Sequence, residues 1–295
     1  MREAAFPLPG SADAVVAVPA PGGGVGWWAG ASSAALDRDG TYVIAYRVRT
    51  GERGRGSTVV ARSPDGERFE TVSTLDQARF GAASMQRPAV VRTDGHWRLY
   101  VCNASPPPSK HWWIDLLEAD DPADLGDAEA RTVFPGDEHT GVKDPLVQRT
   151  PDGGWRAWIC CHPLDEPHEE DRMTTAYATS ADGVEWRWYG TALAPQAGTW
   201  DARGARLTVV LPDGRAAYDG RATKEENWFE RTGLARLTGD GGKLEQVGDH
   251  AVADVRYLDV LPLPAGGYRI WYEARLPDES HELRTELVGR DFRSS

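Results

Sequence analysis

The sequence contains few cysteines: Cys102, Cys160 and Cys161 are the only ones in 295 residues. Three thiols cannot all pair within one chain, and the adjacent Cys160 and Cys161 would pair with each other only under strain. Three cysteines alone also lack the ligand spacing of a metal site. We therefore expect reduced, mostly buried thiols, no metal, and a protein of the cytoplasm, where thiols stay reduced.

Long apolar segments and an excess of basic residues are absent as well. No run of 18 apolar residues occurs, and the first 20 residues lack the continuous apolar stretch of a secretory signal, so we expect no membrane association. The chain has 45 acidic and 33 basic residues, which gives a formal net charge of −12. Nucleic acids and anionic membranes repel such a charge, so we expect neither as a partner, although a local basic pocket stays compatible with it.

Turn-forming and aromatic residues are abundant: the chain has 32 glycines, 20 prolines and 12 tryptophans. Five segments share one pattern, which consists of an alternating apolar strand, a tight turn that contains glycine, and a second strand that usually carries Tyr or Trp. Glycine supplies the positive φ that such hairpin turns need. The predicted hairpins are residues 32–49, 87–104, 144–161, 206–222 and 256–275.

The hairpins belong to larger units, because each is followed by a third strand and four of them by a fourth. Four strands that recur at intervals of 52 to 61 residues are typical of β-propeller blades. The last unit lacks a fourth strand, which residues 14–19 are free to supply, so that no sheet edge stays exposed. We predict an all-β single domain over residues 1–295, a five-bladed propeller closed by the N-terminal strand. The predicted blades are 28–76, 84–136, 141–193, 199–248 and 254–290.

Two turns between third and fourth strands share the pattern Ser-x-Asp-Gly, followed three positions later by an aromatic residue. They are SPDGERF at 63–69 and SADGVEW at 180–186. Both resemble the Asp-box turn, in which the Asp accepts backbone N–H bonds and the aromatic residue packs between blades. We expect Asp65 and Asp182 to be structural and to lie on the outer rim.

The propeller geometry also predicts a site. The first strand of each blade starts near the axis on the face to which the second strand returns, so side chains at these points converge on one funnel. First-strand starts supply Trp28, Ser32, Gln86, Arg87, Lys143, Asp144, Asp201, Arg203, Arg256, Tyr257 and Asp259, and second-strand ends supply Arg47, Arg49, Asn103, His162, Asp219, Arg221, Glu273 and Arg275. Any one of these can be an ion pair between blades, but a packed axis does not need so many charges. Aromatic faces beside carboxylates and arginines suit a sugar.

The blade rhythm, over nearly the whole chain, and the triplet Lys143-Asp144-Pro145 resemble the five-bladed β-propeller glycosidases. These are the arabinanases and xylosidases of glycoside hydrolase family 43, with invertases and levansucrases as relatives. The resemblance implies that Asp144 orients the general acid and tunes its pKa. The family's general acid is a Glu at the start of blade four, where the nearest acidic residue here is Asp201, and Glu230 is a second candidate.

The first blade departs from the family pattern. The family places its catalytic base, an Asp, at a position where this chain has Ser32, and no residue between Asp13 and Asp37 is acidic. Glycoside hydrolysis needs a second carboxylate beside the acid. For a glycosidase, the resemblance therefore leaves the base or nucleophile to residues elsewhere, with Asp219 and Glu273 as candidates.

We predict an enzyme that acts on a small glycoside or a sugar-like molecule without a cofactor. The predicted catalytic residues are Asp144, Asp201 and Glu230, and the predicted substrate-binding residues are Trp28, Arg87, Lys143, Arg203, Asp219, Arg256, Tyr257 and Glu273. Three alternatives stay open: a sugar-binding or degenerate propeller without activity, an enzyme of another reaction class, and a sialidase-like enzyme. In the last, Arg87, Arg203 and Arg256 would grip a substrate carboxylate, and Tyr257 would pair with Glu230 or Glu273 as nucleophile.

Overall fold

The computed structural model describes residues 5–10, 13–51, 55–239 and 241–289. Within these ranges the protein is all-β, with two short 3₁₀ helices, η1 (Gln77–Phe80) and η2 (Pro122–Gly126), and no α-helix. No helix in these ranges is long and apolar enough to cross a membrane. The predicted all-β class is confirmed, whereas the two ends of the predicted domain lie outside the described residues.

The strands form antiparallel units of four. Unit one contains β2 (Trp28–Leu36), β3 (Tyr42–Thr50), β4 (Arg55–Ser63) and β5 (Glu70–Asp76). Unit two contains a first strand split into β6 (Ser84–Met85) and β7 (Ala89–Arg92), then β8 (Trp97–Ala104), β9 (Trp112–Ala119) and β10 (Arg131–Phe134). Unit three contains β11 (Thr140–Arg149), β12 (Trp155–Pro163), β13 (Thr174–Ser180) and β14 (Arg187–Leu193). Unit four contains β15 (Gly204–Val210), β16 (Arg215–Arg221), β17 (Arg231–Thr238) and β18 (Lys243–Val247).

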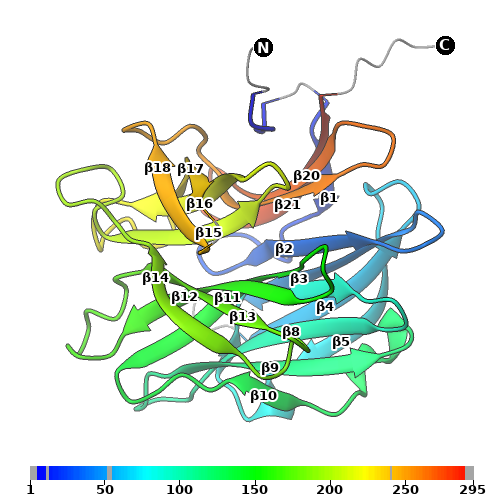
Figure 1. Ribbon diagram of the computed structural model, residues 1–295, viewed down its shortest axis with the longest axis horizontal. Helices are drawn as coiled ribbons and strands as arrows, with labels where there is room; N and C mark the ends of the chain where they lie inside the picture. The colour runs from blue at the N-terminus through cyan, green and yellow to red at the C-terminus, as the bar shows by residue number, and fades with distance from the viewer. Residues whose placement is uncertain (1–4, 11–12, 52–54, 240, 290–295) are drawn as a thin grey trace.

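Unit five takes its fourth strand from the N-terminal part of the chain. It contains β19 (Arg256–Pro262), β20 (Tyr268–Arg275) and β21 (His281–Val288), and β1 (Val15–Val18) pairs antiparallel with β21. A single parallel bridge between Trp28 and His281 joins units one and five into one sheet of eight strands. In Figure 1, β2, β11 and β15 lie toward the middle of the molecule, and β10 and β18 lie at opposite edges.

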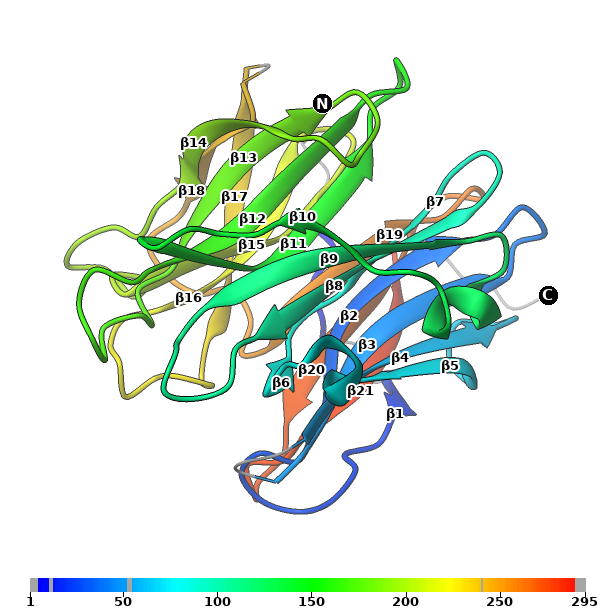
Figure 2. The same cartoon turned by 90° about the horizontal axis from the view of Figure 1, so that it is seen from below.

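Five apolar clusters hold the units together, and each lies between neighbouring units. They join units one and two, two and three, three and four, four and five, and finally five and one. In the last cluster Ile44 and Val59 of unit one share a buried core with Trp271 and Leu283 of unit five. Each unit is covered by a neighbouring unit on both of its faces. Its strands therefore carry apolar side chains on both faces. Figure 2 shows units three and four adjoining on one side of the molecule and units one and five on the other.

The two Ser-x-Asp-Gly turns also tie neighbouring units together. Asp65 accepts hydrogen bonds from the backbone N–H groups of Glu67 and Arg68, and Asp182 makes the equivalent pair. The turn glycines have φ of +74° and +76°, which a glycine adopts without strain. The indole N–H of Trp271 donates to the carbonyl of the first turn, and the hydroxyl of Tyr100 donates to that of the second, each from the preceding unit.

Candidate functional site

A pocket with a volume of about 490 Å³ opens among the described residues. Its lining comes from all five units, chiefly from residues where first strands begin and second strands end. Eight arginines and lysines line it, against three carboxylates, although the whole chain carries a net charge of −12. Of the predicted site residues, five contribute to the lining: Trp28, Lys143, Glu230, Arg256 and Tyr257.

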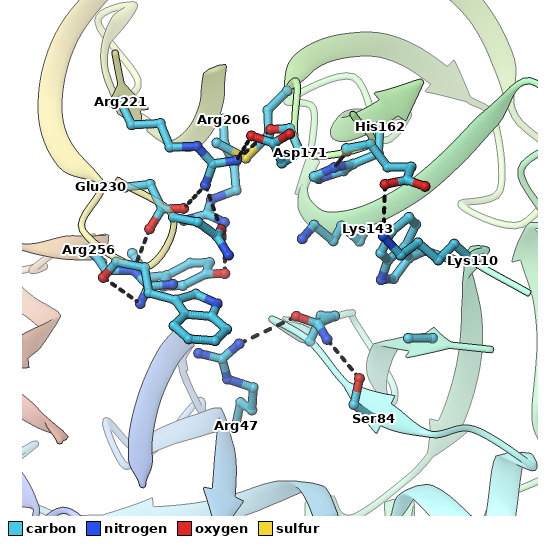
Figure 3. Close-up of a pocket in the computed structure, with 18 of the residues that line it drawn as sticks. Arg47, Ser84, Lys110, Lys143, His162, Asp171, Arg206, Arg221, Glu230 and Arg256 are labelled. Atoms are coloured by element: carbon cyan, nitrogen blue, oxygen red, sulfur yellow. Dashed lines mark hydrogen bonds and ion pairs between the residues drawn. The ribbon is translucent and has the colours of Figure 1, made fainter. Parts of the chain in front are cut away.

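One wall of the pocket is a buried chain of ion pairs around Glu230 (Figure 3). Its carboxylate accepts a hydrogen bond from Arg221 Nη1 at 2.5 Å, and its other oxygen lies 2.9 Å from Arg256 Nε. Arg256 Nη1 continues the chain to Glu273 Oε1 at 3.2 Å. Burial opposes the charge of Glu230, but the positive charges of Arg256, Arg206 and Arg221 outweigh burial and hold its pKa well below the usual range. Glu230 is therefore ionised at neutral pH.

The floor of the pocket is a second buried network, centred on Arg206. Its guanidinium donates to Asp144 Oδ2 at 3.1 Å, to the Tyr257 hydroxyl oxygen at 2.8 Å and to Asp219 Oδ2 at 2.6 Å. The Tyr257 hydroxyl in turn donates to Asp144 at 3.3 Å. Burial raises the pKa of Tyr257, so its proton stays in place at neutral pH. Burial also opposes the charge of Asp144, but Lys143 and Arg206 together hold its pKa below the usual value.

A β-bulge in the first strand places Asp144 and Tyr257 at these positions. Pairing with the second strand is interrupted at one equivalent point in units one, three and five. Inside these bulges Ala31, Asp144 and Tyr257 have φ of +54°, +50° and +51°. Side chains other than glycine avoid such angles, so the shared conformation marks equivalent positions at a site that the fold holds under strain.

This equivalence corrects the alignment of unit one. The residue of unit one that corresponds to Asp144 is Ala31, not Ser32, because each directly follows the last residue paired before the interruption, Gly30 and Lys143. Ser32 is fully buried, and its hydroxyl has no hydrogen-bond partner among the described residues. Neither residue is acidic, so unit one contributes no carboxylate at this point.

Aromatic rings interleaved with arginines form the wall that unit one contributes. Trp28 and Trp228 pack edge to face with ring centroids 5.2 Å apart. The guanidinium groups of Arg47, Arg49 and Arg256 lie 5.4, 4.8 and 5.5 Å from the ring centroid of Trp28. Burial, together with the positive charges of Arg47 and Arg256, lowers the pKa of Arg49 to about 10. Arg49 still carries its charge at neutral pH, so this wall is strongly positive.

The facing wall contains a cation without an ionic partner. The Lys143 ammonium lies 5.5 Å from the ring centroid of Trp112 and makes no hydrogen bond or ion pair with any residue that the structure describes. The imidazole of His162 packs against the same ring at 5.2 Å. Burial, and then the charge of Lys143, hold the pKa of His162 well below its usual value, so the imidazole is neutral. Nearby, Lys110 pairs with Glu170 at 2.8 Å.

Arg87 was predicted to bind substrate, but the structure places it below the pocket and not in its lining. Its side chain donates to the carbonyl oxygens of Ser32 and Thr208, both at 3.0 Å, and lies 3.8 Å from Asp259. Its backbone N–H donates to Asp144 at 3.0 Å. Arg87 thus joins four other units through the interior, which leaves its donors no access to a ligand.

Asp201 and Arg203 are also outside the pocket lining. The Asp201 carboxylate turns away from the pocket and accepts a hydrogen bond from the Tyr218 hydroxyl at 2.8 Å. Arg203 binds Asp171 through two hydrogen bonds, at 2.6 and 3.0 Å, and so holds the acidic segment 164–172 against unit four. Both residues precede β15, and the charged side chain that β15 sends to the pocket is Arg206.

Arg206 is the functional residue that sequence reasoning missed. It lies within the run GARLTVV of β15. A charged residue in a buried apolar strand indicates that the fold provides an ionic partner for it. Asp219 and Glu273, both predicted to bind substrate, are buried beneath the lining as partners of Arg206 and Arg256. Lys110 and Trp228 also line the pocket, but they lie in loops. Strand periodicity could not identify them, because loops have none.

No protein-family model and no curated protein matches the sequence. Solved structures nevertheless share the fold. A thermostable family-43 glycoside hydrolase matches with a TM-score of 0.65 and 14% identity, over 92% of this chain and 93% of that one. The GH43_1 enzyme from Xanthomonas citri, complexed with xylotriose, matches with a TM-score of 0.64 and 14% identity, over 95% and 92%.

A third neighbour is a β-1,2-mannobiose phosphorylase from Listeria innocua, with a TM-score of 0.64 and 13% identity, over 90% of both chains. The structural neighbours are β-propeller enzymes of the family 43 and family 32-like glycoside hydrolases, as the sequence resemblance predicted. At this level of identity the likeness defines the fold, and the residues of the pocket must carry any statement about activity.

Proposed function

We propose that this protein is an enzyme that cleaves the glycosidic bond of a small glycoside or sugar-like substrate in the pocket. The observation that carries the proposal is the position of Glu230, an ionised carboxylate in the lining of a pocket with aromatic walls. Trp112 and Trp228, both partly exposed, offer apolar faces to a sugar ring, and a volume of about 490 Å³ suits a ligand of one or two sugar rings.

We further propose that the five units are the blades of one ring, a single domain with the pocket at one mouth. The apolar cluster between units five and one and the pairing of β1 with β21 support this arrangement. So do the contacts of β2 with both β7 and β19. A closed ring explains how residues distant in sequence reach one pocket.

The two buried networks suggest separate roles in catalysis. Glycosidic cleavage develops positive charge on the sugar ring, and an ionised Glu230 would stabilise that charge or deprotonate an attacking water. A proton donor must keep its proton at neutral pH, which Tyr257 does and Glu230 does not. Asp144 and Arg206 would hold the Tyr257 hydroxyl in position.

A sialidase-like reaction is a second candidate, and the Tyr257–Asp144 contact of 3.3 Å favours it. In this reaction the Tyr257 oxygen would attack the anomeric carbon, while its proton passes to Asp144 and the leaving group departs. Asp144 would then replace Glu230 or Glu273 as the predicted partner of the tyrosine. Of the predicted cluster of Arg87, Arg203 and Arg256, only Arg256 lines the pocket.

Sugar binding without catalysis is the alternative that the ion pairs favour. Asp144, Asp219, Glu230 and Glu273 are each paired with an arginine. Asp219 has a raised pKa because of its burial, but it lies beneath the lining, and no lining carboxylate is protonated at neutral pH. A conventional pair of acid and base is therefore not assembled among the described residues in this state.

A panel of aryl glycosides and sialosides tests these candidates, with the wild type, Asp144→Asn and Tyr257→Phe measured side by side. If Tyr257 donates the proton, Tyr257→Phe loses most activity on glycosides with poor leaving groups and little on those with good ones. If Tyr257 is the nucleophile, the variant is inactive on all of them. Sugars that bind the wild type but are never cleaved would refute the enzyme and support sugar binding without catalysis.

The cytoplasmic location predicted from the cysteines stays a prediction. All three thiols are buried and unpaired, which is compatible with a reducing compartment. A substrate available there would be a small imported or intracellular molecule.

A further inference from the structure

The pocket lining contains more cations than carboxylates, eight against three. Arg47, Arg206, Arg221 and Arg256 pair with carboxylates, namely Asp144, Asp171, Asp219, Glu230 and Glu273, and Lys143 belongs to none of these ion pairs. Lys143 makes no ion pair or hydrogen bond with a described residue, and its ammonium lies beside the Trp112 ring. A half-buried ammonium loses hydration and gains little from one aromatic ring. An anionic group of a ligand would therefore form a favourable ion pair with it.

The surrounding cations converge on the same region of the pocket. The carboxylate of Asp144, at the floor, is influenced by Lys143, Arg206 and Arg47, which come from three different units. In Figure 3, Arg47 and Lys143 reach toward the open centre of the cavity from opposite sides. Arg47 has one ionic partner, Glu273, at 3.2 Å, and Gln86 at 3.4 Å holds its other nitrogen. Arg47 is thus held by two partners and still contributes to the lining of the pocket.

Arg49 adds a further positive charge to the lining of the pocket. It stacks on Trp28 and Trp228, where burial and its arginine neighbours both disfavour its charged form. An anion between Arg47, Arg49 and Lys143 would be attracted by three positive charges, whereas a neutral sugar would not.

We propose that the sugar-like ligand of this pocket carries an oxyanion, a phosphate or a carboxylate, which binds between Lys143 on one wall and Arg47 and Arg49 on the other. This inference rests on the proposed function for the sugar-like part of the ligand. The anion itself depends only on the charge of the pocket. Arginine binds such groups with paired hydrogen bonds and lysine as a point charge, and the pocket offers both.

Isothermal titration calorimetry with four probes tests the proposal: glucose, glucose 6-phosphate, glucuronate and inorganic phosphate. Wild-type protein should bind at least one charged sugar about tenfold or more tightly than glucose, since a hydrogen bond to a charged group is worth about that factor. The affinity should fall when sodium chloride rises from about 20 to about 200 mM, because salt screens the attraction. Inorganic phosphate that binds as tightly as the sugar phosphate would keep the anion site and assign it to a free co-substrate.

Variants at position 143 separate a ligand contact from a structural role. Lys143→Gln should lose about tenfold in affinity for the charged probe and nothing for glucose, and Lys143→Arg should restore most of the loss. Lys243→Gln is the matched control, because Lys243 lies on the outer strand β18 and donates only to the carbonyl of Thr191. Equal affinity for charged and neutral sugars, or an unchanged affinity in folded Lys143→Gln, would overturn the proposal.

Failure of the proposed function looks different. Tight binding of a charged sugar without turnover of any glycoside would refute the enzyme and keep the anion site. Turnover of neutral glycosides with no gain from a charged group would refute the anion site and keep the enzyme.

Discussion

Arg87 and Lys143 stand near the same point of two successive units, yet the structure uses them in opposite ways. Every face of Arg87 meets an acceptor: two carbonyl oxygens and, at 3.8 Å, Asp259. Lys143 meets an aromatic ring and an open cavity. A basic side chain enclosed by acceptors stabilises the fold, whereas one that faces a cavity without an acceptor is available to a ligand.

The largest effect should come from removing the enclosed charge. Arg87→Met leaves the carbonyls of Ser32 and Thr208 and the carboxylate of Asp259 without their donor, so the free energy of unfolding should fall by about 3–5 kcal/mol. Urea denaturation measures the difference. Arg131→Met is the control, because its pair with Glu185 is exposed and should contribute less than about 1 kcal/mol. Equal effects of the two substitutions would show that the interior contacts of Arg87 add nothing.

Asp259, the acidic partner of Arg87, should make the free energy of unfolding depend on pH. Burial raises its pKa from 3.8 to about 6, despite the charge of Arg87. The folded state therefore holds this proton more tightly than the unfolded chain. The resulting stabilisation is complete below about pH 4 and is lost as the pH rises through about 6, with a total change of about 3 kcal/mol at most.

The Asp259→Asn variant lacks that titration. The difference in free energy of unfolding between wild type and Asp259→Asn should shift against the wild type between pH 4 and pH 6 and stay constant above pH 7. Carboxyl groups with lowered pKa values, such as Glu230, change below this window and cancel in the difference. Parallel stability curves from pH 4 to pH 8 would contradict the raised pKa.

The outer turns should show a smaller effect and none on the pocket. Asp65→Ala and Asp182→Ala each remove the acceptor of two backbone N–H groups in a solvent-exposed turn. Each should lower the free energy of unfolding by about 1 kcal/mol and leave ligand binding unchanged. Thermal unfolding with and without ligand provides both values. A loss of binding in either folded variant would place these turns in the site after all.

The smallest effect on stability is expected at the pocket wall. Lys143→Gln removes a contact with Trp112 and a positive charge near Asp144, which keeps its ion pair with Arg206, so the free energy of unfolding should change by about 1 kcal/mol or less. Urea denaturation under the conditions used for Arg87→Met makes the two values comparable. A loss as large as that of Arg87→Met would identify Lys143 as a structural residue.

The strands were predictable because their signals are local. Alternating apolar residues and glycine turns specify a hairpin within about 20 residues, and the predicted hairpin 256–275 begins where β19 begins and ends where β20 ends. The pairing of β1 with β21 followed from a missing strand in the last unit. The repeat then indicated which strand ends would meet, and residues from such ends do line the pocket.

The direction of each side chain was not predictable, because it depends on bulges that the sequence does not mark. A shift of one residue reverses the face to which a strand residue points, and the bulges after Gly30, Lys143 and Arg256 set the positions of Ala31, Asp144 and Tyr257. In unit four the same uncertainty led to Asp201 and Arg203, whereas the strand presents Arg206 to the pocket. Contacts between units, such as those of Arg87, have no local signal at all.

The most direct test compares two carboxylates in one steady-state experiment. On any glycoside that the wild type cleaves, Glu230→Gln should lower kcat/KM about a hundredfold or more. The substitution removes the charged carboxylate that lies between Arg221 and Arg256 in the described lining. Asp201→Asn, which keeps an acceptor for Tyr218, should stay within about threefold of the wild type. The opposite ranking, with Asp201→Asn inactive and Glu230→Gln active, would contradict the placement of the active site in this pocket.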